Sequence, residues 1–247
     1  MKLAEMTWQE VDALPREVVF VLPTGSLEQH GPHLPLFTDS ILATSVAEAV
    51  EAQLQDKVVL LPTLWLGASA HHLDFAGSLS ASFETYMGAV SDCIESLIPH
   101  GFARFYILNG HGGNSEPNGM ALRTLKARYP NLTFAHSNYY TFAERTSADL
   151  LTGPAKTIQH ACEAEASLIM HLRPDLVRAD KLRDDGLRAD PPIVGLVSHF
   201  DEITEQGSLG YATLATPEKG RVIFEAAVDG VAKNIGSIHA GHVFVGA

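Results

Sequence analysis

The chain has 247 residues, of which 46% are hydrophobic, and this is enough for one large domain with a well-buried core. Its 17 Lys and Arg against 29 Asp and Glu give a net charge of -12, which excludes the basic footprint of a protein that binds nucleic acid or an anionic membrane. No apolar run reaches the roughly 18 residues of a transmembrane helix, and residues 1–16 lack the apolar core of a signal peptide. We therefore expect a cytoplasmic protein that acts on a small molecule, with a single domain over residues 1–247 and with Cys93 and Cys162 as free thiols.

Short apolar runs rich in β-branched and aromatic residues predict strands, and longer amphipathic stretches predict helices. In chain order, strands are expected at residues 17–23, 57–62, 104–109 and 132–136, and helices at 39–55, 82–98, 115–129, 160–172 and 217–235. This alternation is typical of an α/β fold in which helices cover both faces of a parallel sheet. The polar segments 67–82 and 141–156 are expected to form loops or flaps over one edge of that sheet.

Several good metal ligands follow the first expected strand. Residues 28–33 read Glu-Gln-His-Gly-Pro-His, and Asp39 comes shortly after them. Carboxylates and imidazoles suit Zn, Mn or Fe, and loops that follow parallel strands converge at one edge of the sheet. His111 lies in a Gly-rich turn after the third expected strand, so we expect Glu28, Asp39 and His111 to meet. That turn could instead hold a phosphate, but its spacing matches neither the dinucleotide fingerprint nor the P-loop.

Another group of ligand-type residues opens the fourth expected helix, where residues 159–165 read Gln-His-Ala-Cys-Glu-Ala-Glu. Acidic side chains in a first turn favour the helix dipole, so Glu163 and Glu165 also have an ordinary structural explanation. His160 could equally be a helix-start residue bonded to backbone. Of the other histidines, His33 and His72 could each either contact the site or have an ordinary polar role. His71 is expected at the surface.

Three motifs together resemble the creatininase, or creatinine amidohydrolase, family in order and spacing. They are LPTGSLEQHGPHLPLFTDS at 22–40, ILNGHGGN at 107–114 and HACEAEAS at 160–167. The stretch GSLGYATLATPEKG at 207–220 is similar to that family's segment before its last helix. The resemblance implies a three-layer αβα sandwich with a mainly parallel central sheet of four strands, and a homohexamer. It also implies two divalent metal ions per chain, with Zn ranked ahead of Mn or Fe.

The resemblance assigns roles position by position. Glu28, Asp39 and His111 would hold one ion, and His30, Asp39 and Glu165 would hold the other, so that Asp39 bridges the two. His160 falls on the family's catalytic histidine.

One ligand position departs from the pattern of creatininases, which carry a glutamate where this chain has Gly113. Other members with a His-Gly-Gly-Asn motif use a glutamate that aligns with Glu165. The last ligand is therefore assigned to Glu165, with Glu163 as the fallback.

The implied activity is hydrolysis of a C–N bond outside ordinary peptide bonds. The substrate would be a small cyclic or linear amide, creatinine-like or a formamide, attacked by a metal-bridging hydroxide. His160 would protonate the leaving nitrogen or steady the tetrahedral intermediate. Creatinine-cleaving members close the site with tryptophans before the catalytic histidine, and residues 138–159 contain none, which argues against creatinine itself.

Two alternatives are kept. The first is a creatininase-family peptidase that trims a small redox-cofactor precursor. The second is a non-catalytic metal-binding α/β protein. Structural metal sites usually have four Cys or His ligands, so the mixed carboxylate and imidazole set favours catalysis.

Overall fold

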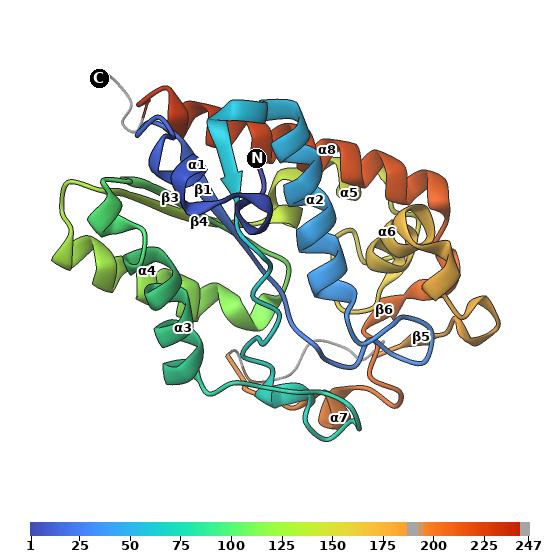
Figure 1. The fold of residues 1–247 in the computed structure, drawn as a ribbon. Coiled ribbons are helices and arrows are strands. Elements are labelled where there is room, and N and C mark those ends of the chain that lie inside the picture. Colours follow the sequence, from blue (N-terminus) through green and yellow to red (C-terminus); the bar gives the residue numbers. More distant parts are fainter. Residues whose placement is uncertain (187–192, 194, 243–247) are drawn as a thin grey trace.

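A parallel sheet forms the centre of the fold and positions the loops that carry the ligand-type residues. The computed structural model describes residues 1–186, 193 and 195–242, and four parallel strands in it run in the order β2-β1-β3-β4 (Figure 1). They are β1 (Val19–Thr24), β2 (Val58–Leu60), β3 (Arg104–Asn109) and β4 (Thr133–Asn138). The four expected strands are therefore confirmed, with small shifts at their ends.

Helices cover both faces of this sheet. One layer holds α2 (Thr38–Leu54), α6 (Glu163–Leu172) and α8 (Pro217–His239), and the other holds α3 (Phe83–Glu95) and α4 (Ser115–Arg128) (Figure 1). Along β1, Val19 and Val21 pack into the first layer's core, whereas Phe20 and Leu22 pack into the second. This alternation follows from the period of two along a strand, and burial on both sides explains why β1 reads as a continuous apolar run. The expected αβα sandwich is confirmed.

Local sequence signals set the starts of the main helices. At α8, the Thr216 side chain accepts a hydrogen bond from the backbone N–H of Lys219, and Pro217 occupies the first helical position. At α3, Ser82 accepts from the backbone N–H of Thr85. Both are favourable N-terminal caps. None of the helices in the described ranges is long and apolar enough to span a membrane.

The segment 141–156 was expected to be a loop and is largely helical. A 3-10 turn at Tyr139–Ala143 leads directly into α5 (Glu144–Leu150). Tyr139 and Ala143 are fully buried and pack into the core beside α2, α6 and α8. Tertiary packing therefore orders a stretch whose polar composition predicted a flap.

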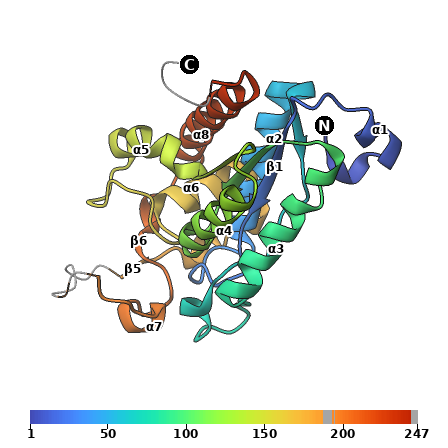
Figure 2. The same cartoon turned by 90° about the vertical axis from the view of Figure 1, so that its left-hand side faces the viewer.

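Three short elements had no counterpart in the sequence prediction, together with α1 (Trp8–Asp12) near the N-terminus. The pair β5 (Asp184–Asp185) and β6 (Gly210–Tyr211) is antiparallel, and α7 (Phe200–Ile203) lies between them in sequence. Figure 2 shows all three at the lower end of the molecule, the end at which the chain leaves β1. They therefore border the edge of the sheet where the ligand-type residues gather.

Candidate metal centre

The carboxyl ends of β1 and β3 bring the first ligand-type residues together. Glu28 and His30 lie in the loop after β1, Asp39 lies in the first turn of α2, and His111 follows β3 directly. Close packing at Gly110 allows this, since a Cβ there would lie 2.5 Å from the backbone oxygen of Asp39. The start of α2 thus rests against the turn after β3.

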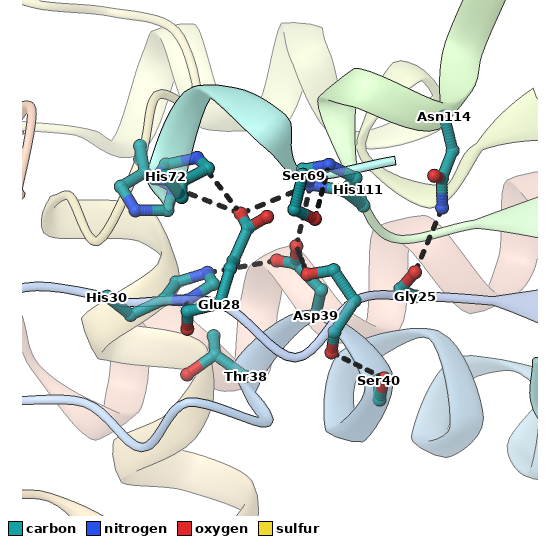
Figure 3. Close-up of polar contacts among 12 residues, drawn as sticks. Gly25, Glu28, His30, Thr38, Asp39, Ser40, Ser69, His72, His111 and Asn114 are labelled. Carbon is teal, nitrogen blue, oxygen red and sulfur yellow. Dashed lines mark hydrogen bonds and ion pairs between the residues drawn. The ribbon is translucent and has the colours of Figure 1, made fainter. Parts of the chain in front are cut away.

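Glu28, Asp39 and His111 form a compact buried cluster. One ligand atom from each lies within 4.8 Å of the others. His111 Nδ1 is 3.1 Å from Glu28 Oε1 and 3.0 Å from Asp39 Oδ2 (Figure 3). All three side chains are buried. The structure therefore brings together the first ligand set that the sequence predicted.

A second cluster holds His30, His160 and Glu165, again with one ligand atom from each within 4.8 Å of the others. His30 Nε2 lies 3.0 Å from Asp39 Oδ1. Asp39 therefore directs one oxygen to the histidine of each cluster, Oδ1 to His30 and Oδ2 to His111 (Figure 3). This is the placement expected of a bridging carboxylate.

Hydrogen bonds from neighbouring groups fix the orientation of both histidines. His30 Nδ1 donates to the backbone oxygen of Glu28 at 3.1 Å, and His111 Nε2 donates to the backbone oxygen of Ala68 at 3.2 Å. The other ring nitrogen of each histidine faces Asp39, so it is placed to bind a cation once it has lost its proton. Such outer partners select the tautomer that binds a cation.

The carboxylates are held in the same way. Ser26 Oγ donates to Asp39 Oδ2 at 2.7 Å, and the backbone N–H of Ala161 donates to Glu165 Oε2 at 2.5 Å. Ala161 has a left-handed backbone with φ of 49°, an unusual conformation for a non-glycine residue, which directs its N–H toward Glu165.

Burial and charge shift the pKa values of the cluster. Burial alone would lower the pKa of His30, but the Asp39 carboxylate outweighs it and raises this pKa to about 9. Burial also opposes protonation of His111, yet Glu28 and Asp39 raise its pKa well above the ordinary value. Burial raises the pKa of Glu165 to about 8. Glu28 and Asp39 thus draw positive charge into the site, whereas burial favours the protonated form of Glu165 in the absence of a cation.

Glu28 shows most directly that this donor set fits cations. Its side chain is only 1% exposed, its Oε1 faces the ring nitrogens of His72 and His111, and its Oε2 has no polar partner in the described part of the chain. A buried carboxylate with an unpartnered oxygen is costly, and a bound cation would relieve that cost. The residues present therefore fit two divalent ions with mixed oxygen and nitrogen ligands.

The two candidate glutamates of α6 lie in different environments. Glu165 faces the second cluster, whereas Glu163 lies 2.6 Å from Lys219 Nζ of α8. Glu163 also accepts hydrogen bonds from the backbone N–H groups of Thr152 and Gly153 at 2.9 and 3.0 Å. The geometry thus favours Glu165 over the fallback as a ligand.

His160 precedes α6, whereas the sequence had placed it inside that helix. The ring Nε2 donates to the backbone oxygen of Gln29 at 2.7 Å, and Nδ1 lies 3.7 Å from Glu28 Oε1. Burial and the neighbouring His30 charge hold the pKa of His160 well below its ordinary value, which keeps the imidazole neutral.

The three histidines whose roles were open or peripheral all lie at or beside the site. His72 is buried, with Nε2 3.3 Å from Glu28 Oε1, while Gln29 Nε2 donates to its Nδ1 at 2.8 Å. His33 Nε2 donates to the backbone oxygen of Ala161 at 2.9 Å and so supports the backbone beside His160.

His71, which was expected at the surface, is half-buried and also contributes to the site. Its ring stacks on that of His111, with a centroid separation of 5.6 Å, and it lines the pocket over the clusters. The side-by-side His71-His72 pair was the only sequence signal available, and it could not give the direction of either ring.

Both clusters open onto one pocket of about 310 Å³. Tyr140, Ile158, Phe200 and Leu209 complete its walls, and none of the described lining residues is a tryptophan. The Phe200 ring packs at 4.1 Å from that of His72 and 4.6 Å from that of His160. The sequence gave no signal for Phe200, because α7 is a short helix that lies outside the recognised motifs and has no periodic pattern.

An α/β fold with carboxylates and imidazoles gathered at its strand ends is typical of metal-dependent hydrolases. Comparison with known proteins makes the class specific. The sequence model of the creatininase family, described as creatinine amidohydrolase, matches residues 4–235. The chain therefore belongs to the creatininase family, a family of hydrolases.

Individual relatives carry two kinds of name. The chain is 30% identical to the creatinine amidohydrolase of Pseudomonas putida, over 94% of this chain and 95% of that one. It is 33% identical to the mycofactocin precursor peptide peptidase of Mycobacterium tuberculosis, over 87% of this chain and 83% of that one. Similarity of sequence alone thus does not separate these two activities.

Solved structures agree with this assignment. A crystal structure of creatininase superimposes with a TM-score of 0.82 at 31% identity, covering 96% of both chains. A Zn-Zn form of a mutant creatininase and a Mn form of creatininase match with TM-scores of 0.80 and 0.82, at 30% and 31% identity; each comparison covers 95% of this chain and 96% of the other. A glutamate-to-glutamine mutant of creatininase in complex with creatine also matches, with a TM-score of 0.82 at 31% identity over 96% of this chain and 98% of that one. Relatives of this chain therefore bind Zn or Mn, and one holds a small amide-related ligand.

Proposed function

We propose that this protein is a dinuclear metal-dependent amidohydrolase that cleaves a C–N bond of a small cyclic or linear amide. Glu28, Asp39 and His111 would hold one divalent ion, and His30, Asp39 and Glu165 the other. The main support for the proposal is the position of Asp39: its two oxygens face the histidines of the two separate clusters. Zn is the expected metal, with Mn or Fe as alternatives.

Different groups at the site would have different roles in the reaction. Two bound divalent ions would lower the pKa of a water and polarise the amide carbonyl. His160 is neutral, lines the pocket and carries its proton on Nε2, which donates to the backbone of Gln29. Its unprotonated Nδ1 is therefore the atom placed to accept a proton from the attacking water and then pass it to the leaving nitrogen. Phe200 covers the rings of His72 and His160 and limits the access of bulk water.

The walls of the pocket limit the range of possible substrates. Tyr140, Ile158, Phe200 and Leu209 offer an apolar surface without tryptophan, and this supports a linear or formamide-type amide over creatinine. Peptidase activity therefore remains a second candidate function besides amidohydrolase activity. The homohexamer implied by the family resemblance stays a prediction, which light scattering of the purified protein checks.

The direct test is hydrolysis by metal-loaded protein. Chelator-treated protein is reloaded with Zn or Mn and offered creatinine, a formamide and short peptides, and release of the amine is measured. We expect turnover of at least one substrate class that disappears on chelation and returns on reloading. Protein that holds two ions per chain and hydrolyses none of these amides would overturn the proposal.

The two glutamates of α6 provide a matched pair for the ligand assignment. Glu165→Gln should lose the second ion, whereas Glu163→Gln should keep both, because Glu163 faces Lys219. Metal content by elemental analysis gives the result. The reverse pattern would transfer the ligand role to Glu163.

A further inference from the structure

The metal pocket has a neighbouring cavity that the proposed function leaves unused. This second cavity has a volume of about 500 Å³ and is lined partly by α5. Tyr140 and Ile158 line both the metal pocket and the second cavity. The two spaces therefore adjoin along these two side chains.

The lining of the second cavity combines apolar surface with positive charge. Ala148, Ile158 and the Tyr140 ring supply apolar contacts, and Arg145 and Lys156 supply two cations against one carboxylate, that of Glu144. The Lys156 ammonium group donates to the backbone oxygen of Leu151. This lining suits a ligand that has an apolar part and a terminal anionic group.

Arg145 has guanidinium donors that are available to a ligand. It is exposed, and within the ranges that the structure describes it makes neither a hydrogen bond nor an ion pair. A guanidinium group binds a carboxylate through two parallel hydrogen bonds, a geometry that an ammonium group does not offer. Arg145 is therefore suited to a carboxylate brought by a ligand.

The position of His160 decides which part of a substrate would enter the second cavity. Ile158, which borders both cavities, is two residues before His160, the proton donor to the leaving nitrogen in the proposed mechanism. The leaving amine must lie on the His160 side of the scissile bond. A chain on that nitrogen that extends past Ile158 enters the second cavity, which Arg145 lines.

We propose that the second cavity binds the leaving portion of an N-acyl amino acid or short peptide, with its carboxylate on Arg145 and an apolar side chain against Tyr140 and Ile158. For an N-acyl amino acid, which is a linear amide, this inference rests on the proposed amidohydrolase function and specifies its substrate class; for a short peptide it rests on the peptidase candidate. In the reaction the acyl carbon gains the hydroxyl group of water, the C–N bond breaks, and the nitrogen gains the proton. The released amine carries the free carboxylate.

A binding experiment tests the proposal without requiring turnover. The probe is a tripeptide analogue with apolar side chains in which CH2–NH replaces each CO–NH, so that it cannot be hydrolysed, and it is prepared with a C-terminal carboxylate and with CH2OH in place of that carboxylate. Isothermal titration calorimetry with the metal-loaded protein measures both affinities. We expect the carboxylate form to bind about tenfold more tightly, the size of one charge-assisted hydrogen-bonding contact.

Variants assign that preference to Arg145. Arg145→Met should reduce it to less than about twofold, since only a partly engaged lysine remains nearby. Arg123→Met is the matched control, because Arg123 is an exposed arginine on α4 that lines neither of these two cavities, and it should keep the full preference. Thermal melting of both variants verifies that they are folded.

Each outcome is decisive for one of the two proposals. Equal affinity of the two forms, absence of binding by either, or a preference that survives in Arg145→Met would overturn the carboxylate subsite. A preference that depends on Arg145, combined with no hydrolysis of the unmodified tripeptide or of any other amide, would instead overturn the amidohydrolase function and leave the subsite intact.

Discussion

Gly113 stands where creatininases carry a glutamate, and the structure predicts that this position cannot accept even a methyl group. A Cβ at Gly113 would lie 2.5 Å from the backbone oxygen of Ala68 and from His111 Nε2, and 2.8 Å from His71 Cε1. His111 Nε2 already donates to Ala68, so the added atom would intrude on that hydrogen bond. At the adjacent Gly112, a Cβ would meet nothing within 4 Å.

The size of the effect follows from these contacts. Forcing a methyl group into a well-packed site costs about 1–3 kcal/mol. In a domain of this length each kcal/mol lowers Tm by roughly 2–4 °C, so we expect Gly113→Ala to lower the Tm of the metal-free protein by roughly 2–12 °C. Gly112→Ala should leave Tm unchanged or raise it slightly, because alanine restricts the unfolded chain.

The assay is differential scanning calorimetry of the two alanine variants and the parent after metal removal, followed by metal analysis after reloading with Zn. We expect Gly113→Ala to bind less metal, because displacement of the His111 ring weakens the cluster with Glu28 and Asp39. A Gly113→Ala protein that melts within about 1 °C of the parent and keeps its metal would refute this account of how His111 is held.

Other substitutions address catalysis and the buried ion pair. His160→Gln should lower kcat by about 10²–10⁴-fold with metal content unchanged; a parallel loss of metal would show that His160 acts as a ligand instead. Lys219→Met should lower the free energy of unfolding in urea by about 2–3 kcal/mol, because Glu163 keeps its backbone donors but loses its cation. Burial raises the pKa of Glu163, but the hydrogen bonds from Lys219, Thr152 and Gly153 together outweigh it, and the net pKa lies below 4.5. The stabilisation is therefore present above pH 4.5 and lost as pH falls through the folded-state pKa; a difference that persists in stronger acid would contradict the assignment. His199 has a pKa raised above 6.5 by its bond to Asp74, so this pair stabilises the fold below pH 6.5 and ceases to do so as pH rises through the raised value; Asp74→Asn should remove that pH dependence from urea unfolding curves, and an unchanged curve would refute it.

The strands and the first ligand cluster could be predicted because they depend on short-range patterns. Continuous apolar runs mark buried parallel strands, and ligands placed just after β1 and β3 must meet at one edge of the sheet. Glu28, Asp39 and His111 follow from that rule together with the family resemblance, and the structure places them within ion-binding distance of one another.

The remaining parts of the site depend on contacts that sequence patterns do not contain. Glu163 and Glu165 are two positions apart on a helix, so they point to different sides, and Lys219 on α8 determines which of them is engaged elsewhere. The direction of His71 depends on an irregular segment held by the Asn114 side chain, which accepts from the backbone N–H of Ala68 at 2.9 Å. Phe200 approaches from a short helix with no periodic signal.

The proposed dinuclear site depends most on Asp39, the carboxylate that two ions would share. Elemental analysis of the purified protein after exposure to Zn or Mn and removal of free metal tests this directly, with Asp39→Asn as the variant and circular dichroism to verify its fold. We predict close to two ions per chain in the parent and at most one in Asp39→Asn. Folded parent protein that stays metal-free, or an Asp39→Asn variant that keeps both ions, would contradict the dinuclear site.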